Sequence, residues 1–137
     1  MPRVVLDPGV LIAALISGKG APARLLLSWR GGSFELVASP NLLRELGRVL
    51  ARDKFRRYVS LDEAEQYVRM IRRGATLMKD PPEPPPVTPD PKDDYLLGLA
   101  RAANARYLLS GDPHLTELAE PVPPVLTPRA FLDRLEG

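Results

Sequence analysis

The chain has 137 residues, of which 45% are apolar and 26% charged, the balance of one ordinary globular domain. No apolar run reaches the roughly 18 to 20 residues that span a bilayer, and Met1-Pro2-Arg3 leads directly into strand-like residues, so a cytoplasmic protein with no membrane segment or signal peptide is expected. The net charge of +2 is too small to establish nucleic-acid binding, while zero cysteines and one histidine exclude thiolate and histidine-rich metal sites.

The first half of the chain alternates short strand patterns with helical patterns. Strands are predicted at 3–6 and 34–38, where β-branched and apolar residues dominate. Helices are predicted at 10–17, from Ala21-Pro22, at 39–50 and from Ser60 to Gly74. This alternation is typical of βαβ units, in which the strands run parallel.

The second half continues the alternation after one long interruption. A short strand is predicted at 76–78, and the proline-rich segment 81–91 is predicted to be a surface loop. A helix at 92–104, strands at 107–109 and 125–126, and a last helix opened by Thr127-Pro128 follow. The residues after the loop are too few to form a second core, so the whole chain is one α/β domain.

Acidic residues stand at four positions where this fold can bring them together. Asp7 and Asp112 follow predicted strands, Glu45 lies in a helix, and Asp93-Asp94 lie in the first turn of another helix. Ligands of open parallel sheets bind at the carboxyl ends of the strands, and clustered carboxylates are typical ligands of hard cations such as Mg²⁺ and Mn²⁺. The pattern indicates hydrolysis of a phosphodiester by water that the metal activates.

Each acid taken alone also has a purely structural interpretation. Asp7 could cap the following helix, Glu45 could be a solvated helix residue, and Asp112 could open an Asp-Pro turn. Asp93 and Asp94 could be first-turn acids that the helix dipole favours. The basic clusters at 52–57 and 69–73 are typical of solvated helix faces, and His114 is expected to make an ordinary loop or solvent contact.

Three segments, at 4–15, 39–50 and 90–118, together resemble the PIN-domain family, and in particular the toxins of bacterial and archaeal toxin-antitoxin pairs. The resemblance implies a single PIN-like domain over 1–137, with a three-layer α/β/α fold and a central, mostly parallel sheet. It further implies an endoribonuclease that requires Mg²⁺ or Mn²⁺. An RNA substrate, a cognate antitoxin protein and a homodimer or higher homo-oligomer are expected on the same basis.

The residues that match the family's motifs give a candidate site. Asp7, Glu45, Asp93 and Asp112 match the catalytic and metal-binding acids, and Asp94 remains an alternative for the third acid and a candidate ligand. The Ser110 hydroxyl, in the segment Ser-Gly-Asp, is expected to support the ligands. Arg44 and Arg48, one turn around the helix of Glu45, are candidates for contact with the RNA backbone.

The first motif departs from the family pattern. Asp7 is followed by Pro8-Gly9, where the family usually has a polar pair such as Thr-Asn or Ser-Asn. Proline lacks a backbone donor and glycine lacks an amide side chain, so a group that would hold the acid or contact the site is missing. The alternative function is therefore a catalytically weak PIN fold that acts as an RNA-binding or protein-interaction module.

Overall fold

The computed structural model describes residues 1–136, and its centre is a five-stranded sheet in the order β3-β2-β1-β4-β5. Every neighbouring pair of strands is parallel. The strands are β1 Arg3–Leu6, β2 Glu35–Ala38, β3 Thr76–Leu77, β4 Tyr107–Leu109 and β5 Val125–Leu126. The chain thus builds outward from the central β1, first to one edge and then to the other, which confirms the predicted α/β fold with a parallel sheet.

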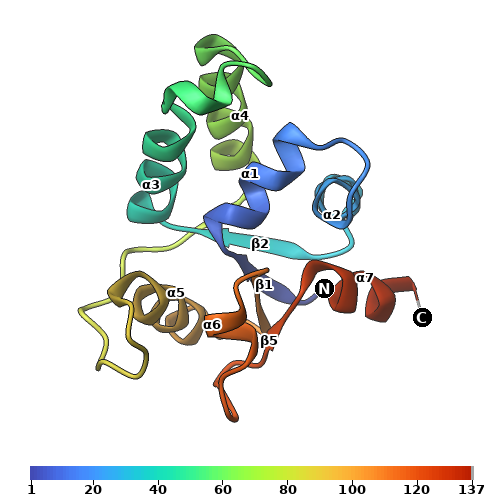
Figure 1. Ribbon diagram of the computed structural model, residues 1–137. Coiled ribbons are helices and arrows are strands. Elements are labelled where there is room, and N and C mark those ends of the chain that lie inside the picture. The colour runs from blue at the N-terminus through green and yellow to red at the C-terminus, as the bar shows by residue number, and fades with distance from the viewer. Residues whose placement is uncertain (137) are drawn as a thin grey trace.

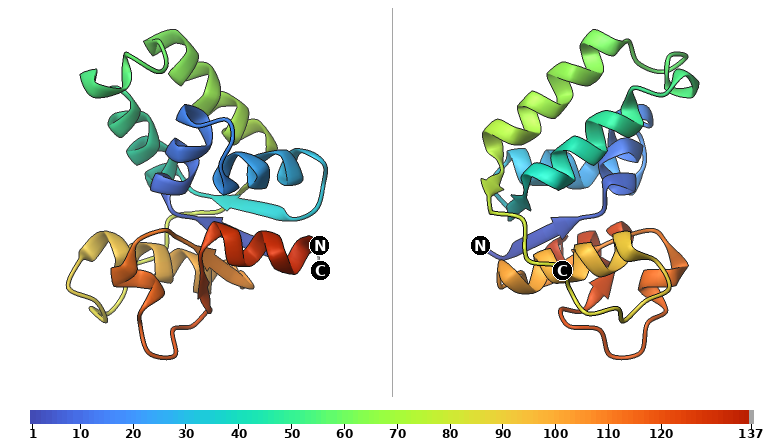
Figure 2. Two further views of the ribbon diagram at one scale, coloured as in Figure 1. Left: turned by 45° about the vertical axis from the view of Figure 1, so that its right-hand side comes forward. Right: turned by 90° about the vertical axis from the view of Figure 1, so that its left-hand side faces the viewer.

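Helices cover both faces of this sheet and make a three-layer α/β/α arrangement. Helices α1 to α4 lie over one face, and α5 and α6 lie over the other, while α7 packs against α2 and β5 (Figures 1 and 2). The α-helices are α1 Pro8–Ile16, α2 Ala21–Arg30, α3 Pro40–Leu50, α4 Leu61–Gly74, α5 Pro91–Ala102, α6 Pro113–Thr116 and α7 Pro128–Glu136, and a 3-10 turn, η1, spans Asp53–Phe55. This layering confirms the fold that the resemblance implies.

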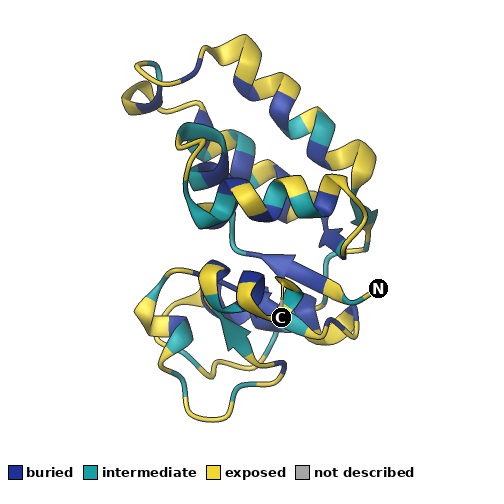
Figure 3. Ribbon diagram, turned by 90° about the vertical axis from the view of Figure 1, so that its right-hand side faces the viewer, coloured by how far each residue is buried: buried dark blue, intermediate teal, exposed yellow. Residues whose placement is uncertain are grey.

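The core lies on both sides of β1. Val4 and Val5 are fully buried, because β2 and β4 flank this strand and helices cover both of its faces. Burial is concentrated where the helices meet the sheet, and the outer faces of the helices are exposed (Figure 3). A strand buried on both faces reads as a continuous apolar run, which is why the Val-Val-Leu sequence predicted it well.

Helix starts explain much of the proline content of the chain. A capping side chain followed by proline opens α1, α3, α5 and α6, with Asp7, Ser39, Asp90 and Asp112 as the caps. Proline suits the first helical position because its fixed φ is helical and its missing N–H would have no intrahelical partner. Three of these caps, Asp7, Ser39 and Asp112, follow strands closely, so the helix starts gather at the carboxyl edge of the sheet.

The element boundaries differ in places from those predicted. Helix α1 begins at Pro8 rather than at residue 10, because Asp7 caps it, and α6 was not predicted, because its four residues are too short to show a period. Segment 81–90 has no regular helix or strand, as predicted. Within residues 1–136 no single helix is long and apolar enough to span a membrane, and only α1 and α2 pass as a pair, bent by 97°.

Candidate functional site

A cleft of about 510 Å³ opens at the carboxyl edge of the sheet, between the starts of α1 and α5 and the side of α3. Four acids that the sequence singled out line it: Asp7, Glu45, Asp93 and Asp112. They come from the ends of β1 and β4 and from helices α3 and α5, which are far apart in the chain. The topology therefore brings these carboxylates to one cleft, where the sequence analysis expected them.

Asp7 is held at two atoms at the end of β1. Its Oδ1 accepts a hydrogen bond of 3.0 Å from Gly9 N, which caps α1, and its Oδ2 accepts one of 2.8 Å from the Ser110 hydroxyl. The same Ser110 Oγ accepts a hydrogen bond of 3.0 Å from Asp112 N. The fully buried Ser110 thus ties Asp7 at the end of β1 to Asp112 just beyond β4.

Both strand-end aspartates also perform the structural roles that the sequence left open. Asp112 Oδ1 accepts a hydrogen bond of 2.9 Å from His114 N and caps α6, as Asp7 caps α1. A carboxylate offers about four lone-pair positions, so capping uses only part of the acceptor capacity of each side chain. His114 itself is exposed, and its backbone makes this contact.

Asp93 is the buried acid of the cleft. Its exposed fraction is 5%, and its Oδ2 has no hydrogen-bond partner among the described residues. Burial is the largest cause that raises its pKa to about 6; repulsion from Asp90, Asp112 and Asp7 also contributes to this rise, and His114 opposes it. An unpartnered buried carboxylate oxygen facing other carboxylates is an unfavourable arrangement that a bound cation would relieve.

Asp94 has the same burial but a different surrounding. Its Oδ1 accepts hydrogen bonds of 3.0 Å from Val87 N and 2.9 Å from Thr88 N, and Asp94 is not among the residues that line the cleft. Asp94 therefore anchors the proline-rich segment to α5, whereas Asp93, one residue earlier, faces the acids. This placement favours Asp93 over Asp94 as the third acid of the candidate site.

Glu45 lines the cleft but is held by cations of the chain itself. Both of its carboxylate oxygens accept hydrogen bonds from Arg48, the shortest at 2.8 Å, and Lys92 Nζ lies 3.4 Å from Oε1. The hydrogen bond from Arg48 lowers the pKa of Glu45 against the opposing effect of partial burial, and Lys92 lowers it further. Glu45 thus stays ionised, and its carboxylate is paired with Arg48 and Lys92.

The two arginines proposed to contact RNA already have partners in this structure. Arg48 is paired with Glu45, and Arg44 donates a hydrogen bond of 2.7 Å to Asn41 Oδ1 on its own helix. Neither arginine is among the residues that line the cleft. Their contact with RNA stays a prediction.

The unusual Pro8-Gly9 pair does not leave Asp7 unsupported. Pro8 occupies the first position of α1, and Gly9 supplies its backbone N–H to Asp7 in place of a polar side chain. Both residues line the cleft, and neither brings a polar side chain into it. Replacement of the usual polar pair by Pro8-Gly9 therefore removes a polar side chain that a ligand could contact, but Asp7 keeps its hydrogen bond from Gly9 N.

Sequence reasoning missed Asp80, an acid that is hydrogen-bonded to Tyr95 of the cleft. Tyr95 lines the cleft, and its hydroxyl hydrogen-bonds to Ser39 Oγ and donates to Asp80 Oδ1, which also accepts from Asn41 N at 3.1 Å. Burial raises the pKa of Tyr95 to about 12, and the bond to Asp80 adds to this rise. Because Asp80 lies in the loop after β3, no strand pattern marked it in the sequence.

The carboxylate oxygens of the cleft are suitable donors for a divalent metal, but they are not gathered around one point. Within residues 1–136 no group of three acids or histidines stands close enough to hold one ion. The donors present are all hard oxygens, and the buried Oδ2 of Asp93 lacks a partner. Ligation of an ion by Asp7, Glu45, Asp93 and Asp112 stays a prediction.

The fold and the cleft together define a parallel α/β/α protein with an acidic pocket at the carboxyl edge of its sheet. The family model described as "PIN domain" matches residues 3–114, and the chain belongs to this family. A search of curated proteins found no match. The matched segment contains every acid of the cleft.

Solved structures share the fold at low sequence identity. PAE2754 from Pyrobaculum aerophilum is similar with a TM-score of 0.65 and 13% identity, covering 99% of this chain and 90% of that chain. VapBC2 from Rickettsia felis, solved bound to a DNA fragment from its promoter, is similar with a TM-score of 0.61 and 11% identity, covering 90% of this chain and 96% of that chain. At these identities the likeness supports the fold alone.

Proposed function

We propose that this PIN-domain protein is a metal-dependent endoribonuclease whose active site is the acidic cleft. The observation that carries the proposal is the buried, unpartnered Oδ2 of Asp93, in the same cleft as Asp7 and Asp112. An isolated carboxylate oxygen in such a place is costly unless a cation satisfies it. When Mg²⁺ or Mn²⁺ is bound, it activates water and neutralises the charge that develops on the phosphate.

The residues of the cleft would divide the remaining tasks. Ser110 and the capped helix starts fix the side chains of Asp7 and Asp112, whose carboxylate oxygens would be metal ligands. Asp93, in the first turn of α5, would complete the ligand set. Lys92 lines the cleft 3.4 Å from Glu45 Oε1 and would offer a positive charge to the substrate phosphate.

The test is cleavage of RNA by the purified chain. Single-stranded and structured RNAs are incubated with Mg²⁺, with Mn²⁺ or with EDTA, and the products are separated by length. The proposal predicts internal cleavage with either metal and none with EDTA. The combined variant Asp7→Asn and Asp112→Asn should lose at least about 10²-fold in rate, the scale on which active-site electrostatic groups act. Full activity in that variant would refute the assignment.

A toxin role with an antitoxin partner is part of the same proposal. It rests on the resemblance of the acid motifs to PIN toxins and on the structural likeness to VapBC2. A short protein encoded beside this chain should co-purify with it and suppress RNA cleavage, and the free chain should assemble as a homodimer in light scattering. Normal growth of a host that expresses the active chain alone would contradict the toxin role.

The second candidate function is a catalytically weak PIN fold that binds RNA or protein. Two observations favour it: Arg48 and Lys92 occupy the carboxylate of Glu45, and Pro8-Gly9 removes the usual polar pair. Metal-dependent turnover separates the two functions. RNA binding that persists with no cleavage in Mg²⁺ or Mn²⁺ would favour the module.

A further inference from the structure

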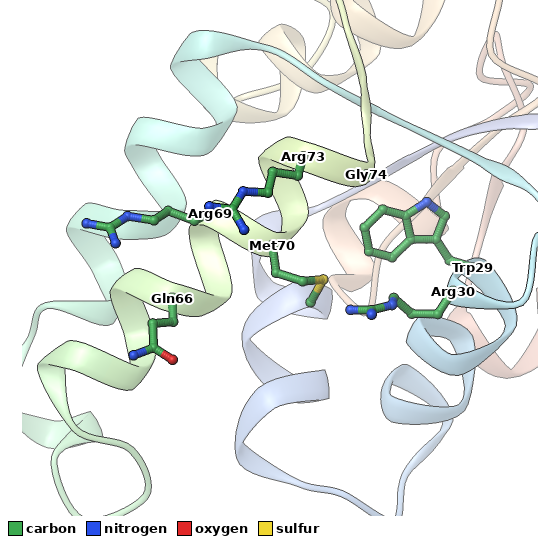
Figure 4. Close-up of a pocket in the computed structure, with 7 residues that line it drawn as sticks. All are labelled: Trp29, Arg30, Gln66, Arg69, Met70, Arg73 and Gly74. Atoms are coloured by element: carbon green, nitrogen blue, oxygen red, sulfur yellow. The ribbon is translucent and has the colours of Figure 1, made fainter.

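A second, larger cleft lies away from the acids, between α2 and α4. It has a volume of about 780 Å³, and every charged residue that lines it is an arginine: Arg30, Arg69 and Arg73. Figure 4 shows the two helices facing each other, with Trp29 and Arg30 on α2 and the other lining residues on α4. We refer to it as the basic cleft.

The wall of the basic cleft is firm where the two helices meet. Trp29 has an exposed fraction of 8%, and a Cβ on Gly74 would stand 2.7 Å from its ring, so the indole packs directly on the α4 backbone. The arginines are exposed, and within residues 1–136 none of the three makes an ion pair or a side-chain hydrogen bond. Their charge is therefore available to a ligand.

The arrangement of the arginines suits an extended anion rather than a small one. Arg30 extends from α2 toward α4, whereas Arg69 and Arg73 extend from α4 away from α2 (Figure 4). The guanidinium groups thus spread over a surface instead of converging on one point. Segment 44–79, which includes α4, carries ten basic and five acidic side chains, so the positive field extends beyond the cleft.

The chain limits how far the basic cleft stands from the acidic cleft. Gly74 lines the basic cleft, and Asp80, six residues later, hydrogen-bonds to Tyr95 of the acidic cleft. Six residues span at most about 22 Å, so this is the upper bound for the path between the Gly74 and Asp80 backbones. A stacked strand that rises about 3.4 Å per nucleotide covers it with roughly six nucleotides.

From these observations we infer that the basic cleft binds the phosphate backbone of the RNA whose cleavage takes place in the acidic cleft, so that long RNAs engage both clefts. This inference rests on the proposed function. Arginines on a firm wall provide sequence-independent phosphate contacts, and the short path between the clefts favours the substrate strand over a separate acidic protein. An oligonucleotide too short to span both clefts can engage only one of them at a time.

The experiment measures RNA binding in EDTA, where no cleavage is proposed to occur. The combined variant Arg30→Gln, Arg69→Gln and Arg73→Gln is compared with a matched variant that removes three exposed arginines outside segment 44–79, Arg106→Gln, Arg129→Gln and Arg134→Gln. The probe is a single-stranded RNA of roughly 20 nucleotides, with a trinucleotide as the short reference. The combination of lysine substitutions at 30, 69 and 73 keeps the charge.

For the long RNA, the cleft variant should bind at least about tenfold more weakly than the matched variant, and the dependence of log K on log salt should be shallower by about 2. The lysine variant should restore both values, and the trinucleotide, which contacts fewer phosphates, should show a smaller loss of affinity and a smaller change in salt dependence than the long RNA. The single tryptophan, Trp29, supplies a local signal, because RNA in the basic cleft should alter its fluorescence.

Two results would overturn the inference. One is equal affinity and salt dependence in the cleft variant and the matched variant; the other is a Trp29 signal that responds to polyglutamate but not to RNA. Because binding is measured without metal, a chain that binds RNA in this way but never cleaves it would contradict the proposed function and leave the location of the binding surface established.

Discussion

At the scale of single residues, the environment of Asp93 differs from that of its neighbour Asp94. Both are buried in the first turn of α5, but Asp94 accepts two backbone N–H groups and Asp93 Oδ2 accepts none among the described residues. The motif resemblance ranked Asp93 first but kept Asp94 as an alternative, because adjacent residues of one helical turn share composition and period. The distinction comes from the loop that folds back onto Asp94 alone.

The raised pKa of Asp93 predicts how stability depends on pH without metal. The unfolded chain loses this proton near pH 4, and the folded protein holds it until about pH 6. The folded state thus binds more protons between these values, so its stability falls as pH rises from about 4 to about 6 and is level above. Asp93→Asn removes the penalty and should be more stable than wild type by about 2 to 3 kcal/mol at pH 8 and by little at pH 4.

Urea unfolding in EDTA at both pH values measures this difference. Asp94→Asn is the matched control, since it weakens the acceptor for two N–H groups and should lower stability at pH 8 by about 0.5 to 1.5 kcal/mol. A gain for Asp93→Asn that is equal at pH 4 and pH 8 would show that its carboxylate is not the source of the penalty.

Ser110 offers a second prediction at this scale. Its hydroxyl is fully buried and joins Asp7 Oδ2 to Asp112 N, so Ser110→Ala leaves both groups without this partner. A loss of about 1 to 3 kcal/mol in unfolding free energy is expected, with Ser110→Thr retaining more of the stability because it keeps the hydroxyl. Equal stability of the alanine variant and wild type in chemical denaturation would refute this role.

At the scale of elements, the proline-rich segment packs against one side of α5. Asp94 binds the backbone at 87 and 88, and Gly98, one turn later, lies where a Cβ would stand 3.1 Å from Pro84. The segment then leads to Asp90, which caps α5, and to Lys92 at the rim of the acidic cleft. Packing of the loop on α5 therefore positions one wall of the candidate site.

Two mid-helix glycines test this packing as a matched pair. Gly47 in α3 has open space where a Cβ would stand, so Gly47→Ala should stabilise the protein by about 0.5 to 1 kcal/mol through helix propensity. Gly98→Ala should not show this gain, because Pro84 must move. Thermal unfolding compares the two, and hydrogen exchange at 87 and 88 should accelerate only in the Gly98 variant. An equal gain for both would show that the loop does not press on α5.

At the scale of the whole molecule, the sequence predicted those features that depend on one continuous segment of the chain. Buried Val4-Val5 and the cap-proline pairs mark β1 and the helix starts, so the parallel sheet and the positions of Asp7 and Asp112 could be anticipated. The pairing of Glu45 with Lys92 and the basic cleft between α2 and α4 could not. Both depend on segments far apart in the chain, whose side-chain contacts no local pattern contains.

The repulsion among the acids of the cleft predicts that the stability of the fold depends on bound metal. The acids of the cleft repel one another, so Mn²⁺ or Mg²⁺ should raise the stability of the fold by about 2.7 kcal/mol when the free metal is near 100 times its dissociation constant. The variant Asp7→Asn with Asp93→Asn should lose this gain. Differential scanning calorimetry measures it, and a metal-dependent rise of the same size in the double variant would place the ion elsewhere.

The most direct measurement of the central claim is anomalous diffraction from crystals of the protein soaked in Mn²⁺. Among residues 1–136 no three acids stand around one point, so binding requires the cleft to contract around the ion. We predict a manganese peak bound by Asp7, Asp93 and Asp112, with Glu45 released from Arg48. An acidic cleft that stays free of manganese at saturating concentration would contradict the account.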